Sequence, residues 1–197
     1  MPQHRRIRCH FPPAPRLASP ARLAAGNRQA PAISELSVPT NPASPIEITA
    51  GPDGALWFTE NYGNKIGRLA TTGTFIEYSL PTSGSEPGHI TVGPDGALWF
   101  TEAVGNKIGR ITTSGTITEY SLPTANAYPW GITVGPDDNL WFVEQSANNV
   151  ASVTTSGTIN EYPLPTNVSG PFDITLGPDN DLWLTENYVD NIALVAI

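Results

Sequence analysis

The chain has 197 residues, of which 39% are hydrophobic and 14% charged, and this length is typical of one domain. No run of about 18 apolar residues is present, which excludes a membrane-spanning helix. Six of the ten basic residues are arginines in the first 28 positions, while the rest of the chain holds four basic and all eighteen acidic residues. Such an acidic body argues against a nucleic-acid partner, which needs clustered Lys and Arg.

The N-terminal segment 1–32 is basic, rich in Pro and Ala, and free of acidic side chains. It predicts a disordered extension; a transit peptide for an organelle and a misplaced start codon are the alternatives. It lacks the apolar core of a secretory signal, which slightly favours a cytoplasmic location and leaves the compartment open. The single cysteine, Cys9, excludes a disulfide within the chain.

The rest of the chain is a repeat with a constant period of 42 residues. The triplet GPD recurs at this spacing, as do one tryptophan and one glutamate: Gly51, Gly93, Gly135 and Gly177; Trp57, Trp99, Trp141 and Trp183; Glu60, Glu102, Glu144 and Glu186. In the second copy, short strands are expected at 89–92, 98–102, 107–112 and 117–122. Turn-forming sequences, GPDG, AVGN and TTSGT, separate them. Four strands in about 40 residues are typical of a β-propeller blade, so we predict an all-β propeller over residues 33–197.

The ends of the repeat array indicate how the propeller closes. Residues 35–40, ELSVPT, match EYSLPT at 77–82, the fourth strand of a blade, whereas the C-terminal NIALVAI matches only a third strand. We therefore expect four blades, with the N-terminal strand pairing into the last blade and removing the exposed sheet edges. A four-bladed monomer, a homodimer with eight blades, and a shortened descendant of a larger propeller all suit these ends.

The stretch EPGHITVGPDGALWFTEAVGNKIGRITTSGTITEYSLPT, residues 86–124, resembles the streptogramin B lyase (virginiamycin B lyase) family, and the resemblance covers about residues 33–197. It implies a seven-bladed propeller that linearises a cyclic depsipeptide antibiotic by elimination at its ester, with a magnesium ion. The implied site contains a Glu-Pro-His motif before a first strand, a second glutamate in the same blade, and another histidine one blade earlier.

Two carboxylates of that site are retained, and its histidines are not. Glu86 and Pro87 match the start of the motif and Glu102 matches the second glutamate, so Glu86 and Glu102 are the candidate magnesium ligands. Gly88 occupies the place of the motif's histidine, and His89, the candidate base, follows one residue later. The second histidine is replaced by Ile46.

The slip of one residue decides where His89 points. On a regular strand it would turn the side chain to the opposite face. In a loop, Gly88 would let the backbone compensate. Glu102 also recurs in every blade, so a repeated structural contact is an alternative to metal binding.

Residues before and within the first strands vary between copies, and loops leading to the innermost strands usually surround the ligand site of a propeller. Tyr128, Trp130 and Phe172 would form an apolar wall, with Glu47, Glu86, His89 and Asp173 beside it; Gly88 completes the candidate ligand-binding set. The ligand expected is a small molecule, a cyclic peptide or a sugar.

Two functions follow, and the sequence leaves open whether the chain is an enzyme. One is a binding or scaffold propeller that has lost part of the catalytic site. The other is a magnesium-dependent carbon–oxygen lyase acting through Glu86, Glu102 and His89. A calcium-dependent lactone hydrolase using Glu47, Glu86 and Asp173 is a third, weaker alternative.

Overall fold

The computed structural model describes residues 32–197, and every regular element in this part is a β-strand. The extension predicted at residues 1–32 lies outside the described part, apart from its last residue. No helix long and apolar enough to cross a membrane occurs in residues 32–197.

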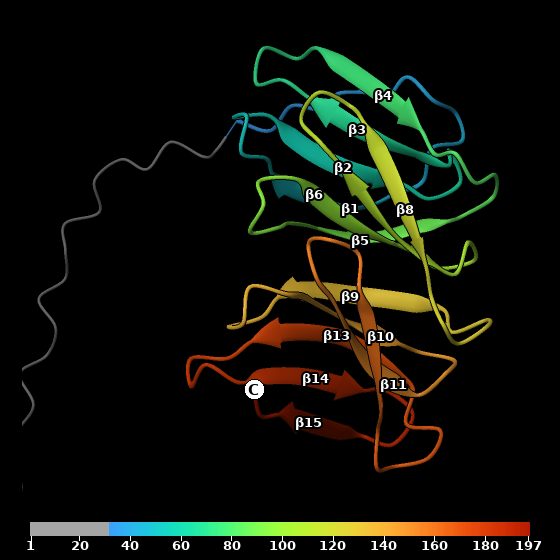
Figure 1. Cartoon of the computed structure of the whole chain (residues 1–197). Helices are drawn as coiled ribbons and strands as arrows, with labels where there is room; N and C mark the ends of the chain where they lie inside the picture. Colours follow the sequence, from blue (N-terminus) through green and yellow to red (C-terminus); the bar gives the residue numbers. More distant parts are fainter. Residues whose placement is uncertain (1–31) are drawn as a thin grey trace, which may run out of the picture. The chain divides into compact units, whose positions relative to one another are not determined.

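The strands form four antiparallel sheets, which we call blades one to four, and strands consecutive in the chain are neighbours in each sheet (Figure 1). Blade one contains β1 Pro45–Ala50, β2 Leu56–Glu60, β3 Lys65–Leu69 and β4 Phe75–Ser79. Blade two contains β5 Pro87–Val92, β6 Leu98–Glu102, β7 Lys107–Ile111 and β8 Ile117–Ser121. Blade three contains β9 Pro129–Val134, β10 Leu140–Glu144, β11 Asn149–Val153 and β12 Ile159–Pro163. Blade four contains β13 Pro171–Leu176, β14 Leu182–Glu186 and β15 Asn191–Val195. The predicted all-β fold of propeller blades is confirmed.

The turn between the first two strands explains why GPD and the tryptophan recur together. In blade two, Asp95 Oδ1 accepts the indole N–H of Trp99 at 3.0 Å and the backbone N–H of Ala97 at 3.3 Å. A Cβ on Gly93 would lie 2.4 Å from Trp99 Cδ1, so only glycine lets the indole ring fold back over the turn. The same aspartate–indole bond is present in the other blades: Asp53 with Trp57, Asp137 with Trp141, and Asp179 with Trp183.

Each pair of adjacent blades encloses one apolar core. Trp99 and Ile108 of blade two pack with Leu140 and Phe142 of blade three. Equivalent residues form the cores between blades one and two and between blades three and four. The tryptophan-bearing face of one blade is therefore covered by the Leu/Phe-bearing face of the next, as strand alternation predicts.

The predicted pairing of residues 35–40 with the last blade is not detected as a strand in the described part of the chain. No strand occurs in residues 32–44, and blade four has three strands. The Thr40 N–H and hydroxyl instead donate to the Glu77 carboxylate at 2.9 and 2.8 Å, as Thr82 does to Glu119 at 2.9 and 2.6 Å. Thr40 is thus held against β4 of blade one. Closure within one chain would need blades one and four to meet, but they lie at opposite ends of the row (Figure 1).

Candidate functional site

A β-bulge in the first strand of each blade sets the direction of the site residues. In blade two, Pro87 pairs with Glu102 and Ile90 with Phe100, so the register shifts between Pro87 and Ile90. The Thr101 hydroxyl accepts the N–H of His89 at 3.1 Å inside this bulge. A bulge re-aims a side chain, so the rule that a one-residue slip reverses the face does not apply to Gly88 and His89.

Three side chains at equivalent positions of three blades meet at the inner strands. His89 Nδ1 lies 3.5 Å from Glu47 Oε2 and 3.8 Å from Asp173 Oδ1. Glu47 Oε2 also accepts the N–H of Ile90 at 2.6 Å, which ties blade one to blade two. Blade three has Gly131 at this position, where a Cβ would lie 2.7 Å from the Asp173 Cα. Glycine there lets blade four approach, and the imidazole reaches carboxylates on both sides.

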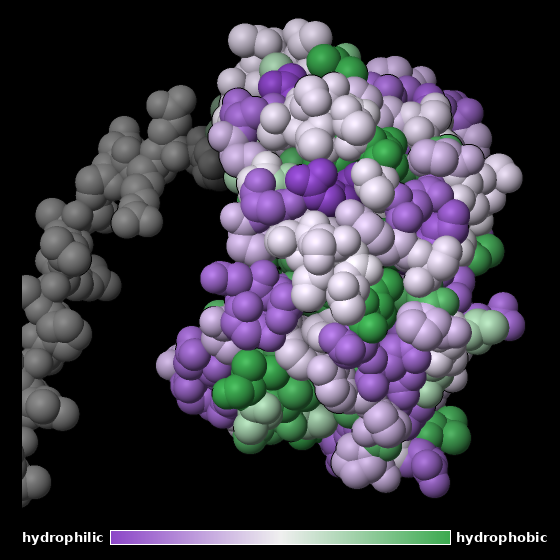
Figure 2. Space-filling view, in the orientation of Figure 1, coloured by the Kyte–Doolittle hydropathy of each residue, from purple (hydrophilic) through white to green (hydrophobic). Residues whose placement is uncertain are grey.

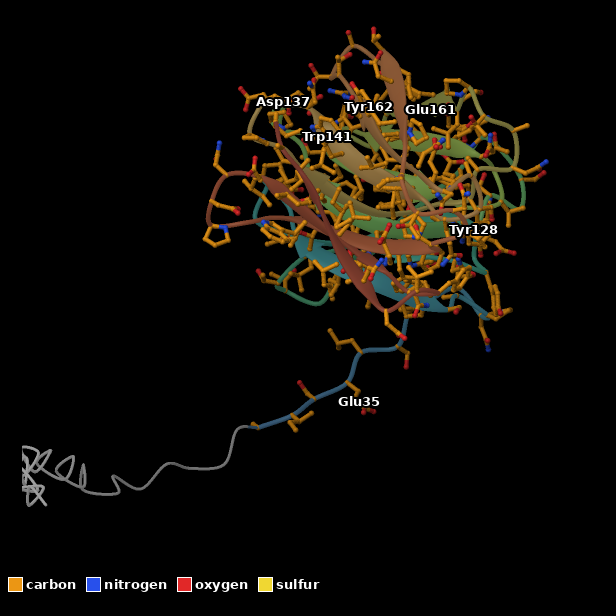
Figure 3. The ribbon with its side chains drawn as sticks, turned by 90° about the horizontal axis from the view of Figure 1, so that it is seen from below. Glu35, Tyr128, Asp137, Trp141, Glu161 and Tyr162 are labelled. Carbon is orange, nitrogen blue, oxygen red and sulfur yellow. The ribbon has the colours of Figure 1, made fainter. Side chains whose placement is uncertain are left out.

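An aromatic wall lies beside this group. The rings of Tyr128 and Trp130 are stacked, with centroids 5.9 Å apart and an interplanar angle of 8°. Trp130 also contacts Phe172 at 5.9 Å and His89 at 5.5 Å, both tilted. Tyr128 lies at the opposite end of blade three from Asp137, whose turn holds the core ring of Trp141 (Figure 3). The predicted apolar wall is therefore brought together.

Glu86 and Tyr128 occupy the same position of successive blades in a left-handed backbone conformation, with φ of 52° and 57°. Ser44 and Gly170 stand there in the other blades with similar angles. Only glycine adopts this region without cost, and strained residues of this kind cluster at ligand sites. Burial, with a further contribution from the Glu86 carboxylate, raises the pKa of the Tyr128 phenol.

Glu102 is fully buried, and neither of its carboxylate oxygens has a hydrogen-bond partner in the described part of the chain. Burial raises the pKa of Glu102 to about 7, against a smaller opposing effect of the Ser85 hydroxyl. Glu60, Glu144 and Glu186 are buried at the same strand position. This recurrence favours the structural alternative for Glu102.

The predicted metal ligands do not form a cluster with His89. No hydrogen bond or ion pair joins Glu86 or Glu102 to His89 within residues 32–197. No three His, Cys, Asp or Glu side chains of this part lie close enough together to hold a metal ion. A magnesium ion held by Glu86 and Glu102 with water thus stays a prediction.

Three threonines were missed by reasoning from the sequence. Besides Thr101, Thr59 and Thr185 accept the N–H of Glu47 at 3.3 Å and of Asp173 at 3.1 Å, so one hydroxyl supports each converging residue. Their spacing by whole repeat periods was visible in the sequence. The repeat alone could not show that these hydroxyls reach the neighbouring strand.

The pattern of the virginiamycin B lyase family matches residues 25–197, most of the chain. The chain belongs to the virginiamycin B lyase family. A virginiamycin B lyase of Saccharopolyspora erythraea is 54% identical over 41 residues, which are 21% of this chain and 14% of that protein. The crystal structure of the selenomethionine-substituted virginiamycin B lyase of Staphylococcus aureus is 46% identical, with a TM-score of 0.77. The crystal structure of a catalytically inactive variant of the Staphylococcus aureus enzyme with quinupristin is also 46% identical, with a TM-score of 0.75. The match covers 82% of this chain and 58% of that enzyme.

The selenomethionine structure covers 83% of this chain, which spans 59% of that lyase's length. At the position where the family resemblance places a histidine, Gly88 is enclosed. A Cβ there would lie 3.2 Å from the ring of Trp130 and 3.0 Å from the Thr101 hydroxyl. A side chain at position 88 would therefore make a tight contact with Trp130, the equivalent residue of the next blade.

Proposed function

We propose that the chain is a binding propeller that holds a small ligand on the inner strands, against Tyr128, Trp130 and Phe172. The observation that carries this proposal is the Trp130 ring, which stacks with Tyr128, contacts Phe172 and lies 3.2 Å from the place where the Cβ of a side chain at position 88 would be. Stacked and tilted aromatic rings offer a surface for an apolar or flat group. Glu47, Glu86 and Asp173 border it, so the ligand class favoured is neutral or positively charged, such as a cyclic peptide.

Calorimetric titration of the full chain with quinupristin tests this proposal. We expect binding without ring opening, weakened by about tenfold or more in Trp130→Ala because aromatic anchors dominate such sites. The matched control is Tyr162→Ala, which removes a tyrosine that is 44% exposed and stacked on Trp141, away from the wall. No heat of binding with a folded protein, or equal weakening in both variants, would count against a cyclic depsipeptide as the ligand.

A second function, carbon–oxygen lyase activity, is favoured by the carboxylates around His89. A carboxylate near Nδ1 can orient an imidazole, which leaves Nε2 to take a proton from the carbon beside a carbonyl. The ester C–O bond then breaks, a carbon–carbon double bond forms, and the carboxylate leaves. The residue roles differ from those that the resemblance implies, since Glu47 and Asp173 rather than Glu86 and Glu102 approach the base.

Chromatography with tandem mass spectrometry of quinupristin incubated with the protein separates the two functions. Elimination opens the ring without a change of mass, so the opened product is recognised by its retention and its fragments. Ring opening that His89→Ala abolishes would establish the lyase and contradict a role limited to binding. Parallel reactions with magnesium and with EDTA report whether the ion predicted from the resemblance takes part. Binding without any opened product would leave the binding propeller as the function.

A further inference from the structure

The outer face of blade one is apolar and is not covered by another blade, although Leu36 and Val38 of the N-terminal segment line the cavity on it. Ile48 is 58% exposed, whereas its equivalents in the following blades are 3 to 7% exposed: Ile90, Ile132 and Ile174. A cavity of about 330 Å³ lies on this face, lined in part by Ile48, Phe58, Leu69 and Phe75. In blades two to four the same face is covered by the preceding blade.

The outer face of blade four, which is its tryptophan-bearing face, is not covered by another blade. Ile192 is 63% exposed, whereas the equivalent Ile66, Ile108 and Val150 are at most 3% exposed. A cavity of about 190 Å³ lies here, lined in part by Ile174, Trp183 and Ile192. Figure 2 shows hydrophobic residues at the surface beside the C-terminal strands β14 and β15.

These two faces are the two halves of one interface. Inside the chain, the tryptophan-bearing face of each blade packs on the Leu/Phe-bearing face of the next, and this contact is made three times. Blade four exposes the first kind of face, with Trp183. Blade one exposes the second kind, with Phe58. The fitting partner for each is therefore the other face, presented by a second copy of the chain.

Blade four has three strands, and a segment near the N-terminus has the sequence of a fourth strand. Thr82 and Thr124 each donate to a glutamate of the next blade's fourth strand, Glu119 and Glu161. Thr166 is their equivalent before blade four, and its side chain makes no such bond in the described residues. Glu35 stands one repeat period before Glu77, the equivalent glutamate of blade one, so residues 35–40 carry the sequence that blade four lacks.

We propose that two copies of the chain form one closed ring of eight blades. Blade four of each copy packs on blade one of the other, and residues 35–40 of each copy add the fourth strand to the other's blade four. In this ring every blade-one face and every blade-four face of the two copies is covered, and eight blades are within the range of known propellers. The ring also removes the exposed edge of β15.

Sedimentation or light-scattering measurements on the full chain test the ring. We expect a mass of about twice 21.0 kDa. Ile48→Asp and Ile192→Asp each place a charge in both interfaces of the ring and should give monomers. The control Val104→Asp, at a residue that is 55% exposed in blade two, should remain dimeric. Circular dichroism shows whether each variant is folded.

Mixing the two monomeric variants gives a sharper test. In a mixed pair one interface carries both aspartates and the other carries none, so an open dimer should re-form through the intact interface. Glu35→Ala should weaken the wild-type dimer by about tenfold through the loss of its bond to Thr166. A folded wild-type monomer at all concentrations, a mass that keeps rising with concentration, or failure of the mixed variants to associate would overturn the proposal.

Discussion

The buried glutamates have a consequence for the pH dependence of stability. Burial raises the pKa of Glu102 and of Glu144 to about 7, from the ordinary value of 4.5 in an unfolded chain. The folded protein then binds more protons than the unfolded chain between these values. The stabilisation from the protonated groups is complete below about pH 4.5 and is lost as the pH rises to about 7.

The aspartates of the GPD turns act in the opposite direction. Burial tends to raise the pKa of Asp95, but the hydrogen bonds from Trp99 and Arg110 outweigh it, so the pKa lies below its ordinary value. Their contribution is present above the ordinary pKa of an aspartate and is lost in more acidic solution. Stability should therefore be greatest near pH 5.

We expect the free energy of unfolding, measured with urea, to fall between pH 5 and pH 8. Glu102 alone contributes on the order of 3 kcal/mol to this fall. Glu102→Gln keeps the shape of the neutral acid, so it should raise stability at pH 8 and flatten the profile. Asp138→Asn is the control, because it removes a carboxylate from an exposed turn residue and leaves the buried glutamates in place. A profile that Glu102→Gln leaves unchanged would contradict the burial argument.

Hydrogen bonds of Lys107 connect blade two to the segment that follows blade one. Lys107 donates to the Thr82 hydroxyl and to Glu119 Oε2, and the side chains of Lys107 and Glu119 are only 23% and 10% exposed. Burial tends to raise the pKa of Glu119, but the bonds from Lys107 and Thr82 outweigh it and lower that pKa. In blade three, Asn149 replaces the lysine, so blades two and three can be compared with and without the lysine–glutamate pair.

A double-mutant cycle of Lys107→Met and Glu119→Gln should give a coupling of about 1 kcal/mol in the free energy of unfolding, because the pair is partly removed from water. Glu161→Gln should cost less than Glu119→Gln, since Glu161 keeps its bonds from Thr124 but has no lysine partner. Equal costs for the two substitutions would show that the lysine adds nothing.

The strands were predictable from the sequence to within about two residues because four copies carry the same alternation and turn residues. The bulge before Ile90 was not, since it is a shift in the pairing of β5 with β6 that the alternation of residues along one strand does not reveal. The meeting of Trp130 and Phe172 followed from their equivalent positions in successive blades, and Tyr128 stands two residues before Trp130. The contacts of His89 with Glu47 and Asp173 required the bulge, and the sequence could not provide it.

At the scale of the whole molecule, blades two and three are covered on both faces, whereas blades one and four are each covered on one face. This difference predicts that local stability is higher in the two middle blades than in the two outer ones. The strands β6 and β10 are buried throughout, whereas β1 and β15 contain residues that are largely exposed. Local opening costs least where few apolar contacts are broken. Amides of β1 and β15 should therefore exchange with solvent faster than those of β6 and β10 in a monomer.

Hydrogen exchange measured at increasing protein concentration links this gradient to assembly. Joining of two copies should slow exchange in β15, whose free edge gains a paired strand, and in β1, while β6 and β10 change little. Ile192→Asp should keep β15 fast at every concentration without affecting β6, which separates loss of the interface from loss of the fold. Exchange that slows equally in all four strands would indicate general stabilisation by association, and exchange independent of concentration would indicate that the end faces stay in contact with solvent.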